Sequence, residues 1–256
     1  MKARVTDYSL ERKSENEHYA KIRVEDVEVF NLPYLLGDMI EKVMENITPA
    51  NEREILDVGA GTGILAVRMA LSGANVTALD ISDKACDIIR LLRKKHSVDG
   101  NIRVINGTLD AIKEDKRYDR VVFLNSLHHM LDDTTLLSIK TVLKSDGKAV
   151  FIEPLKYNPL AFIYRKLYKG EGRTEIEKPM GIEDIGRLKR RFRKVRVEGL
   201  YLLSSILLSA ERVLHTNEKS MLSRVIFKVL NIMDRFLLKL PILKYLGWKV
   251  LIVAQD

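Results

Sequence analysis

The sequence has few of the residues that build disulfide-linked, metal-bound or membrane-spanning proteins. Cys86 is the one cysteine among 256 residues, so the chain can form no internal disulfide. Cysteine and histidine show no zinc-site spacing, so no metal is predicted. No stretch approaches the ~18 uninterrupted apolar residues of a membrane-spanning helix. The charged N-terminus also lacks the apolar core of a secretion signal. These absences favour a cytoplasmic protein.

Basic residues outnumber acidic ones only in the last two-fifths of the chain. Residues 1–155 hold 22 Lys and Arg against 25 Asp and Glu, a net charge of −3, whereas residues 156–256 hold 21 against 10, a net charge of +11. The densest run, Arg187–Arg196, has seven basic residues in ten. Such a run can contact the phosphates of nucleic acid or lipid headgroups. It can also be a helix end followed by a charged edge strand, which we favour, so nucleic acid is not an expected partner.

Short apolar runs alternate with longer amphipathic stretches through the middle of the chain. The runs have the length of buried strands and lie at residues 55–58, 76–79, 102–105, 121–124 and 149–152. The stretches between them show helical periodicity at residues 63–73, 83–96 and 133–144. This alternation, with right-handed crossovers, favours a parallel sheet covered on both faces. The predicted fold is therefore α/β, with a doubly wound, mostly parallel sheet.

Both flanks of this alternating part are predicted to form caps. Before it, apolar residues from Leu35 to Met44 recur at helical spacing, and Thr48-Pro49 ends the pattern. After Pro154 we expect helices at residues 157–170, 183–192 and 217–240, and strands at residues 194–203 and 248–254. No linker or internal repeat divides the chain. We therefore expect one domain over residues 1–256.

A glycine-rich segment follows the first predicted strand. It reads Asp-Val-Gly-Ala-Gly-Thr-Gly from Asp57 to Gly63, and such glycines allow a tight turn and close approach of the backbone to a ligand. Asp80 ends the second predicted strand 17 residues later, where a carboxylate can accept both ribose hydroxyls of a nucleoside. The spacing fits neither the dinucleotide fingerprint nor a P-loop. Asp57 would repel phosphate but suits an ammonium group, so we predict a nucleoside cofactor without phosphates.

Three motifs together resemble the class I S-adenosylmethionine-dependent methyltransferases. They are the segment Asp57–Gly63, the segment Leu79–Ser82, and the segment Tyr118–His129, which ends in Ser-Leu-His-His. The resemblance covers roughly residues 50–155 and implies S-adenosylmethionine as cofactor. It also implies a seven-stranded Rossmann-like sheet with one antiparallel strand near its edge. On this basis residues 1–53 form a helical cap, residues 54–155 the cofactor-binding core, and residues 156–256 the part that shapes the acceptor site.

The resemblance also assigns cofactor-binding roles to individual residues. It implies that the glycines of the turn lie under the methionine part of the cofactor and that Asn125 faces the same part. It also implies that Asp80 binds the ribose, that Ile81 packs on the adenine face, and that Thr108 and Leu109 border the adenine edge. The implied cofactor set is Asp57, Gly59, Ala60, Gly61, Gly63, Asp80, Ile81, Thr108, Leu109 and Asn125. Thr108 departs from the acidic residue that relatives commonly carry there, and Asp110 lies two residues further on.

Methyl transfer from a sulfonium is an in-line displacement that needs mainly alignment and desolvation. A general base is required only when the acceptor must lose a proton. His128, His129 and Glu153 are the candidate catalytic residues, because they follow the fourth and fifth predicted strands. The alternative interpretation is that the histidine pair shapes its loop.

The acceptor is predicted from motifs that the chain lacks. In the family that the sequence resembles, the enzymes that methylate amino groups of nucleic acids carry Asn/Asp-Pro-Pro-Tyr/Phe after the fourth strand, and no such sequence follows the fourth predicted strand here. The RNA cytosine-C5 enzymes of that family use a cysteine nucleophile, whereas Cys86 falls in a predicted helix. We therefore expect an apolar or amphiphilic small molecule, such as a lipid or an isoprenoid. The alternatives are an RNA methyltransferase that uses the basic C-terminal face, and a non-catalytic scaffold with the same fold.

The segment from Arg224 to Leu240 is unusually apolar for a helix. Its polar stripe is narrow and consists of Lys228, Asn231, Arg235 and Lys239. Such a helix is buried nearly all round or lies on a membrane surface. We favour a buried cap. Peripheral membrane contact through residues 199–246 and a dimer face are the alternatives.

Overall fold

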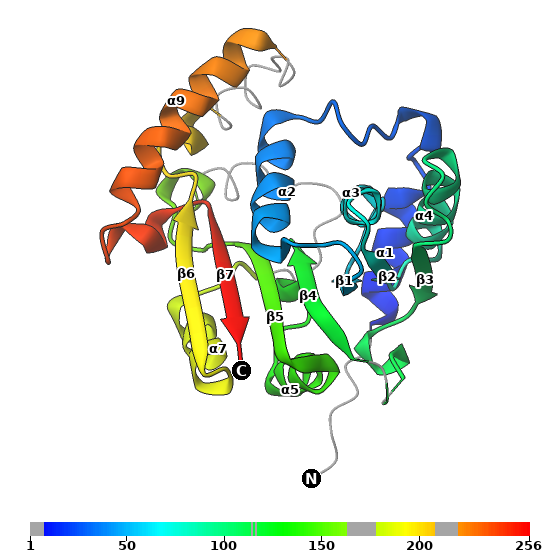
Figure 1. Ribbon diagram of the computed structural model, residues 1–256. Helices are drawn as coiled ribbons and strands as arrows, with labels where there is room; N and C mark the ends of the chain where they lie inside the picture. The colour runs from blue at the N-terminus through cyan, green and yellow to red at the C-terminus, as the bar shows by residue number, and fades with distance from the viewer. Residues whose placement is uncertain (1–7, 114, 116, 163–177, 208–219) are drawn as a thin grey trace.

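The computed structural model describes residues 8–113, 115, 117–162, 178–207 and 220–256, and its centre is one seven-stranded sheet (Figure 1). The strands are β1 (Glu54–Val58), β2 (Asn75–Asp80), β3 (Ile102–Asn106), β4 (Tyr118–Leu124), β5 (Leu143–Pro154), β6 (Lys194–Leu200) and β7 (Lys249–Gln255). Their order is β3-β2-β1-β4-β5-β7-β6. β7 is antiparallel to both β5 and β6, and the other pairs are parallel. The doubly wound, mostly parallel fold is confirmed, with a mixed sheet.

Helices cover both faces of the sheet and create two hydrophobic cores. One face carries α2 (Tyr34–Ile47), α3 (Ile64–Leu71) and α4 (Asp83–Lys95), and the other carries α5 (Asp133–Val142) and α7 (Ile182–Arg191). In Figure 1, α2 and α3 lie in front of the sheet and α7 lies behind β6. Neighbouring strand residues face opposite cores, as Ile55 and Leu56 do. Double burial explains why the central strands are continuous apolar runs.

The predicted element bounds differ from the structure at several ends, and the fifth strand, predicted at residues 149–152, covers Leu143–Pro154. The helix predicted from residue 63 begins at Ile64, because Gly63 has a left-handed φ of 81°. The strand predicted at 194–203 ends at Leu200, before Tyr201 with a φ of 62°. Of the helix predicted at 157–170, residues 159–162 are helical, and residues 163–177 lie outside the described residues.

The burial expected for the long C-terminal helix is wrong. This helix, α9 (Met221–Leu237), is shorter than predicted, and residues 217–219 lie outside the described part of the chain. Its buried residues are Phe227, Asn231 and Asp234, whereas most of its apolar side chains are exposed. The Asp234 carboxylate accepts hydrogen bonds from the amides of Leu203 (2.6 Å) and Ser204 (3.1 Å). Because these polar groups find partners inside, the helix turns part of its polar side inward.

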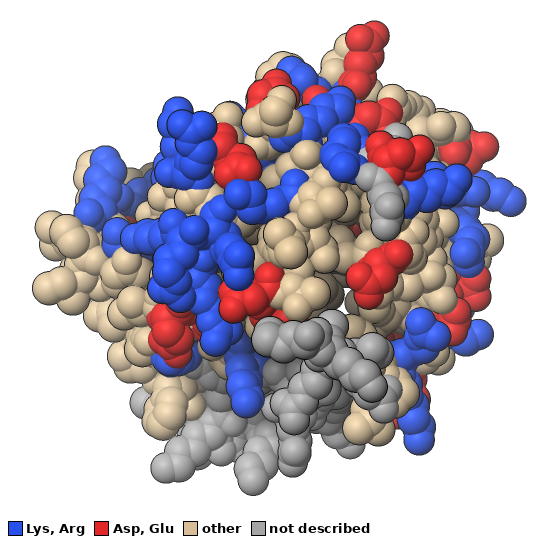
Figure 2. Space-filling view, turned by 90° about the horizontal axis from the view of Figure 1, so that it is seen from below, with Lys and Arg blue, Asp and Glu red and all other residues tan. Residues whose placement is uncertain are grey.

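The part of the basic run that lies in β6 begins at the opposite end of the sheet from the glycine-rich turn. Lys194 of β6 pairs with Gln255 of β7, and Gln255 pairs in turn with Lys148 of β5. Lys148 pairs with Arg120, which lies near the start of β4. The turn follows the other, carboxyl end of β1. Figure 2 shows Lys and Arg side chains gathered on one side of the lower face. The basic side chains at the start of β6 therefore lie away from the end of the sheet that carries the candidate site, whereas Arg187, the first residue of the run, lines a cavity described below.

Candidate active site

The glycine-rich turn after β1 is tightly enclosed by side chains. Gly59, Gly61 and Gly63 have φ values of 68°, 56° and 81°, in the left-handed region that glycine tolerates best. A Cβ atom on Gly59 would lie 2.4 Å from the Ser126 Cβ, and one on Gly61 would lie 2.8 Å from the Tyr19 hydroxyl. The amides of Gly59 and Ala60 donate to the Leu79 carbonyl at 2.8 and 3.1 Å. The turn is thereby fixed beside the end of β2.

Asp80 connects this turn to the start of α4. Its carboxylate accepts hydrogen bonds from the amides of Gly61 (2.8 Å) and Ser82 (2.9 Å). Desolvation by burial raises the pKa of Asp80, although these amide hydrogen bonds oppose the rise. The carboxylate is therefore held in one orientation at the edge of the site.

Asp57 lies beneath the turn as a buried carboxylate that lacks a full set of partners. Its side chain is almost completely buried, and no described residue gives its Oδ2 a hydrogen bond. Desolvation, with a further contribution from the charge of Asp80, raises the pKa of Asp57 to about 7. A cation bound above the turn would compensate this charge.

Asp57 is expected to make stability depend on pH. Its folded-state pKa of about 7 exceeds the ordinary value of 3.8, so between these values the folded protein binds more protons than the unfolded chain. The free energy of unfolding should fall by up to roughly 4 kcal/mol as the pH rises from about 4 to about 7. Urea unfolding of wild type and Asp57→Asn across this range measures the effect. The exposed Asp99→Asn variant should keep the wild-type slope, and an unchanged slope in Asp57→Asn would contradict the assignment.

A cavity of about 190 Å³ opens at the carboxyl ends of the first four strands. Of the residues predicted from sequence, it is lined by Gly59, Asp80, Ile81, Thr108, Leu109, Asn125 and His129. The others do not line it: Asp57, Ala60, Gly61, Gly63, His128 and Glu153. The structure therefore brings together residues from all four strand ends, with the remaining glycines and Asp57 supporting the turn.

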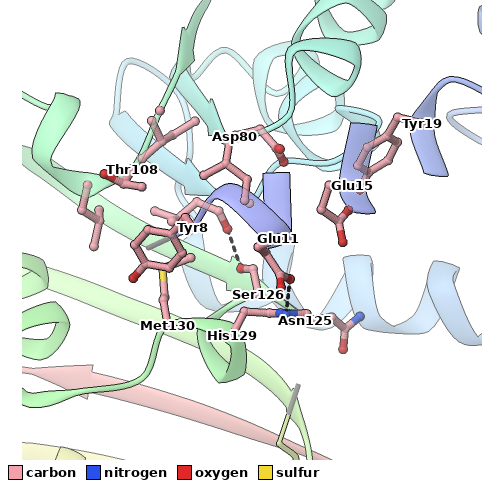
Figure 3. Close-up of a pocket in the computed structure, with 16 residues that line it drawn as sticks. Tyr8, Glu11, Glu15, Tyr19, Asp80, Thr108, Asn125, Ser126, His129 and Met130 are labelled. Atoms are coloured by element: carbon pink, nitrogen blue, oxygen red, sulfur yellow. Dashed lines mark hydrogen bonds and ion pairs between the residues drawn. The ribbon is translucent and has the colours of Figure 1, made fainter. Parts of the chain in front are cut away.

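The N-terminal helix α1 (Ser9–Tyr19) supplies lining residues that the sequence interpretation missed. Figure 3 shows Glu11, Glu15 and Tyr19 of this helix beside the residues that follow the strands. Glu11 pairs with His129 at 2.7 Å, and the Asn16 side chain accepts a hydrogen bond of 2.7 Å from the Ser82 hydroxyl. Tyr8 completes a stripe at helical spacing with these side chains. That spacing was the available signal, but the stripe lacks the apolar residues by which helices are usually recognised.

Glu153 holds the loop after β4 and has no exposed surface. One of its oxygens accepts the amides of Ser126 (3.1 Å) and Leu127 (2.8 Å), and the other lies 2.6 Å from His128 Nδ1. A wholly buried carboxylate in this position does not contact the cavity, so the geometry favours loop positioning over the predicted role as a base. His129 is the member of the histidine pair that faces the cavity.

Asn125 marks the sharp turn at the end of β4. It has a left-handed φ of 59°, and its amide donates to the Ile152 carbonyl at 2.8 Å. Its side-chain oxygen accepts a hydrogen bond from Lys249, at the start of β7. The sequence interpretation missed this contact, because the two residues are far apart along the chain.

A second cavity adjoins the first one. Its volume is about 690 Å³, and it shares Tyr8, His129 and Met130 with the first cavity. Most of its lining side chains are charged or titratable, among them Lys156 and Arg187, and Met130, Leu131 and Pro179 are its apolar members. His129 therefore lines both cavities.

Comparisons with known proteins identify the central part of the chain. Residues 55–147 match the family model described as a methyltransferase domain. The chain is 30% identical over 122 residues to a ubiquinone biosynthesis O-methyltransferase of Bordetella parapertussis, covering 48% of this chain and 51% of that protein. It is 34% identical over 122 residues to the enzyme of the same name from Nitrosomonas europaea, covering 47% and 51%. The chain thus spans about half the length of these curated relatives.

Solved structures share the fold over most of the chain. A Haemonchus contortus phosphoethanolamine N-methyltransferase 2 in complex with S-adenosyl-L-methionine has a TM-score of 0.60 at 18% identity, covering 86% of this chain and 52% of that one. Magnesium protoporphyrin IX methyltransferase from Synechocystis, with bound S-adenosylhomocysteine, has a TM-score of 0.59 at 13% identity, covering 98% and 100%. The family match, the glycine-rich turn and the strand order together identify residues 55–147 as a domain of the class I S-adenosylmethionine-dependent methyltransferases.

Proposed function

We propose that the protein transfers a methyl group from S-adenosylmethionine to an apolar or amphiphilic small molecule. The observation that carries this proposal is the charge of the first cavity. Glu11, Glu15 and Asp80 line it, Asp57 lies beneath the turn, and His129 is the one basic side chain among its described lining residues. S-adenosylmethionine carries a sulfonium and an ammonium group, so an acidic cavity beside a nucleoside site fits its net charge.

The residues around the turn fit this cofactor in more than charge. Asp57 has an oxygen without a hydrogen-bond partner in the described structure, and the backbone at Gly59 packs so closely on Ser126 that a Cβ atom there would collide with it. Asp80 would hold the ribose, while Ile81 and Thr108 would border the adenine. The bound cofactor supplies a methyl group activated by its sulfonium. The protein's part is to orient it, compensate its charge and exclude water.

The second cavity supports an amphiphilic acceptor. It adjoins the cofactor cavity at His129 and Met130 and combines apolar with charged lining groups. The matched relatives are named for ubiquinone biosynthesis, in which the methyl acceptor belongs to a lipid-type molecule. In this proposal His129 accepts a proton where the acceptor carries one, and its pairing with Glu11 supports the role because it would orient the ring.

Cofactor binding is expected to depend on the acidic charge contributed by α1. Glu15→Gln should weaken S-adenosylmethionine binding by about tenfold, because it removes a unit charge near the positively charged ligand in a partly solvated site. Binding of S-adenosylhomocysteine, which lacks the sulfonium charge, should change much less. Isothermal titration calorimetry with both ligands measures the difference. Glu17→Gln is the matched control, since Glu17 is exposed on the same helix and does not line the cavity.

Two results would overturn the proposal. Absence of S-adenosylmethionine binding at millimolar concentration would remove the activity and leave the scaffold alternative. The acceptor class is tested by incubating the protein and methyl-labelled cofactor with cellular lipid extract or with total RNA. Label that enters the organic phase supports the proposed class. Label in RNA alone would favour the alternative RNA methyltransferase.

A further inference from the structure

The outer surface of α9 is an exposed apolar face on the described part of the molecule. None of the described helices has the length and hydropathy needed to span a membrane. On α9, however, apolar side chains recur at intervals of three and four residues and are 38–83% exposed. The exposed apolar face consists of Met221, Leu222, Val225, Ile226, Val229, Ile232, Met233 and Phe236. Leu240 and Ile242, just beyond the helix, are also exposed, at 54% and 80%.

The opposite side of α9 fixes this orientation. Phe227 packs against Tyr34, with 4.5 Å between the ring centroids, and Asn231 donates to the Asp38 carboxylate at 3.1 Å. Asp234 binds the Ser204 hydroxyl at 2.7 Å in addition to the backbone amides described above. Turning the apolar face inward would break all of these contacts. The exposed face is therefore built into the fold.

The charges on α9 select the kind of surface that the apolar face fits. Residues 221–246 contain five basic residues and a single acidic one, Asp234, which is buried. Lys228, Arg235 and Lys239 are exposed, and at 100° per residue they follow one flank between the buried and the apolar faces. We propose that α9 docks the protein on the surface of an anionic lipid bilayer, with its apolar face among the acyl chains and its basic flank at the headgroups.

The location of α9 connects this surface to the candidate site. Tyr201 follows the end of β6 and packs against Phe227 of α9, with 5.8 Å between the ring centroids. Leu200 pairs with Lys249, which pairs with Pro154 at the end of β5. The docking surface is thus at the carboxyl end of the parallel strands, which is also the end with both cavities. An amphiphilic acceptor dissolved in the bilayer would meet the protein from this side, if the proposed function holds.

Self-association through α9 is less compatible with the charges. A second copy would place a second apolar face and a second basic flank against the first, with no exposed acidic residue on either helix to balance them. A bilayer that contains anionic lipid supplies this negative charge. The choice between these two occupants is made by experiment.

Vesicle co-sedimentation of the full chain tests the proposal without measuring activity. The protein should bind to vesicles of phosphatidylcholine that contain about 30 mol % phosphatidylglycerol, and it should bind much less to vesicles of phosphatidylcholine alone. Val229→Glu/Ile232→Glu should lower binding by roughly tenfold or more. Its matched control is Leu91→Glu/Leu137→Glu, because Leu91 and Leu137 are 54% and 56% exposed and Val229 and Ile232 are 53% and 56% exposed. The control should bind like wild type, and circular dichroism verifies that both variants are folded.

A second pair of variants tests the basic flank. Lys228→Gln/Lys239→Gln should weaken binding to the anionic vesicles by about tenfold and reduce its salt dependence. Lys189→Gln/Lys194→Gln, which removes two exposed charges at the other end of the sheet, should have little effect.

Three outcomes would overturn the proposal. The first is absence of binding to the anionic vesicles. The second is equal binding by wild type and the α9 variants. The third is sedimentation velocity showing a wild-type dimer that Val229→Glu/Ile232→Glu converts to a monomer, which would assign the face to a second copy of the chain. Vesicle binding without S-adenosylmethionine binding would leave this proposal intact and remove the proposed function.

Discussion

Glu153→Ala is expected to lower the free energy of unfolding by about 3–5 kcal/mol. The substitution leaves two buried backbone amides, those of Ser126 and Leu127, without their acceptor, and it removes the partner of the His128 ring. The loop after β4 should lose its fixed conformation, and cofactor binding should fall with it, since Asn125 and His129 belong to the same loop. Urea unfolding and calorimetry with S-adenosylmethionine measure the two effects.

The conservative variant separates loop positioning from catalysis. Glu153→Gln keeps one carbonyl oxygen for the two amides, so it should be much less destabilised than Glu153→Ala and should still bind the cofactor. If Glu153 were instead a base that contacts the acceptor, Glu153→Gln would fold and bind normally but lose turnover. Glu45→Ala removes an exposed carboxylate on α2 and should leave the free energy of unfolding nearly unchanged. Wild-type stability in Glu153→Ala would refute the assigned role.

Asp80→Asn should weaken S-adenosylmethionine binding by about 100-fold or more, with a smaller effect on stability. The carboxylate accepts the amides of Gly61 and Ser82, and an asparagine must present its NH₂ group to one of these donors. The turn would then lose a charge-assisted hydrogen bond, worth about 1.5–3 kcal/mol, and the proposed ribose contact would weaken as well. Calorimetry on wild type and variant measures the loss.

Asp83→Asn is the control for this substitution. Asp83 is exposed three residues further along and begins α4. It should retain wild-type affinity, because it lies outside the cavity lining. Wild-type affinity in a folded Asp80→Asn variant would show that the cofactor does not depend on this carboxylate, and the proposed orientation of the ribose would have to be abandoned.

The central sheet and the cofactor end of the site could be predicted because local sequence determines them. Strands buried on both faces need uninterrupted apolar residues, as in Val121–Leu124, and a turn with left-handed residues needs glycine, as at Gly59. Since parallel strands share one carboxyl edge, Asp80 and Asn125 could be placed near each other before their distance was known.

The rest depended on contacts between distant segments. The α1 helix buries little besides Glu11 and is held by polar contacts such as that of Asn16 with Ser82, which no periodic apolar pattern reveals. The orientation of α9 depends on Asp234 finding donors in residues 203–204. An amphipathic pattern identifies a helix but not which of its faces has partners, so the favoured buried cap was wrong.

The position of β7 has a consequence for how the chain reaches this structure. β7 lies between β5 and β6, although residues 249–255 are synthesised after both. A chain elongated only to residue 248 therefore presents two unpaired strand edges, one on β5 and one on β6. Such edges attract other extended segments until the last strand leaves the ribosome and inserts between them. Completion of the sheet thus requires residues 249–255 to insert between two strands that precede them in the sequence.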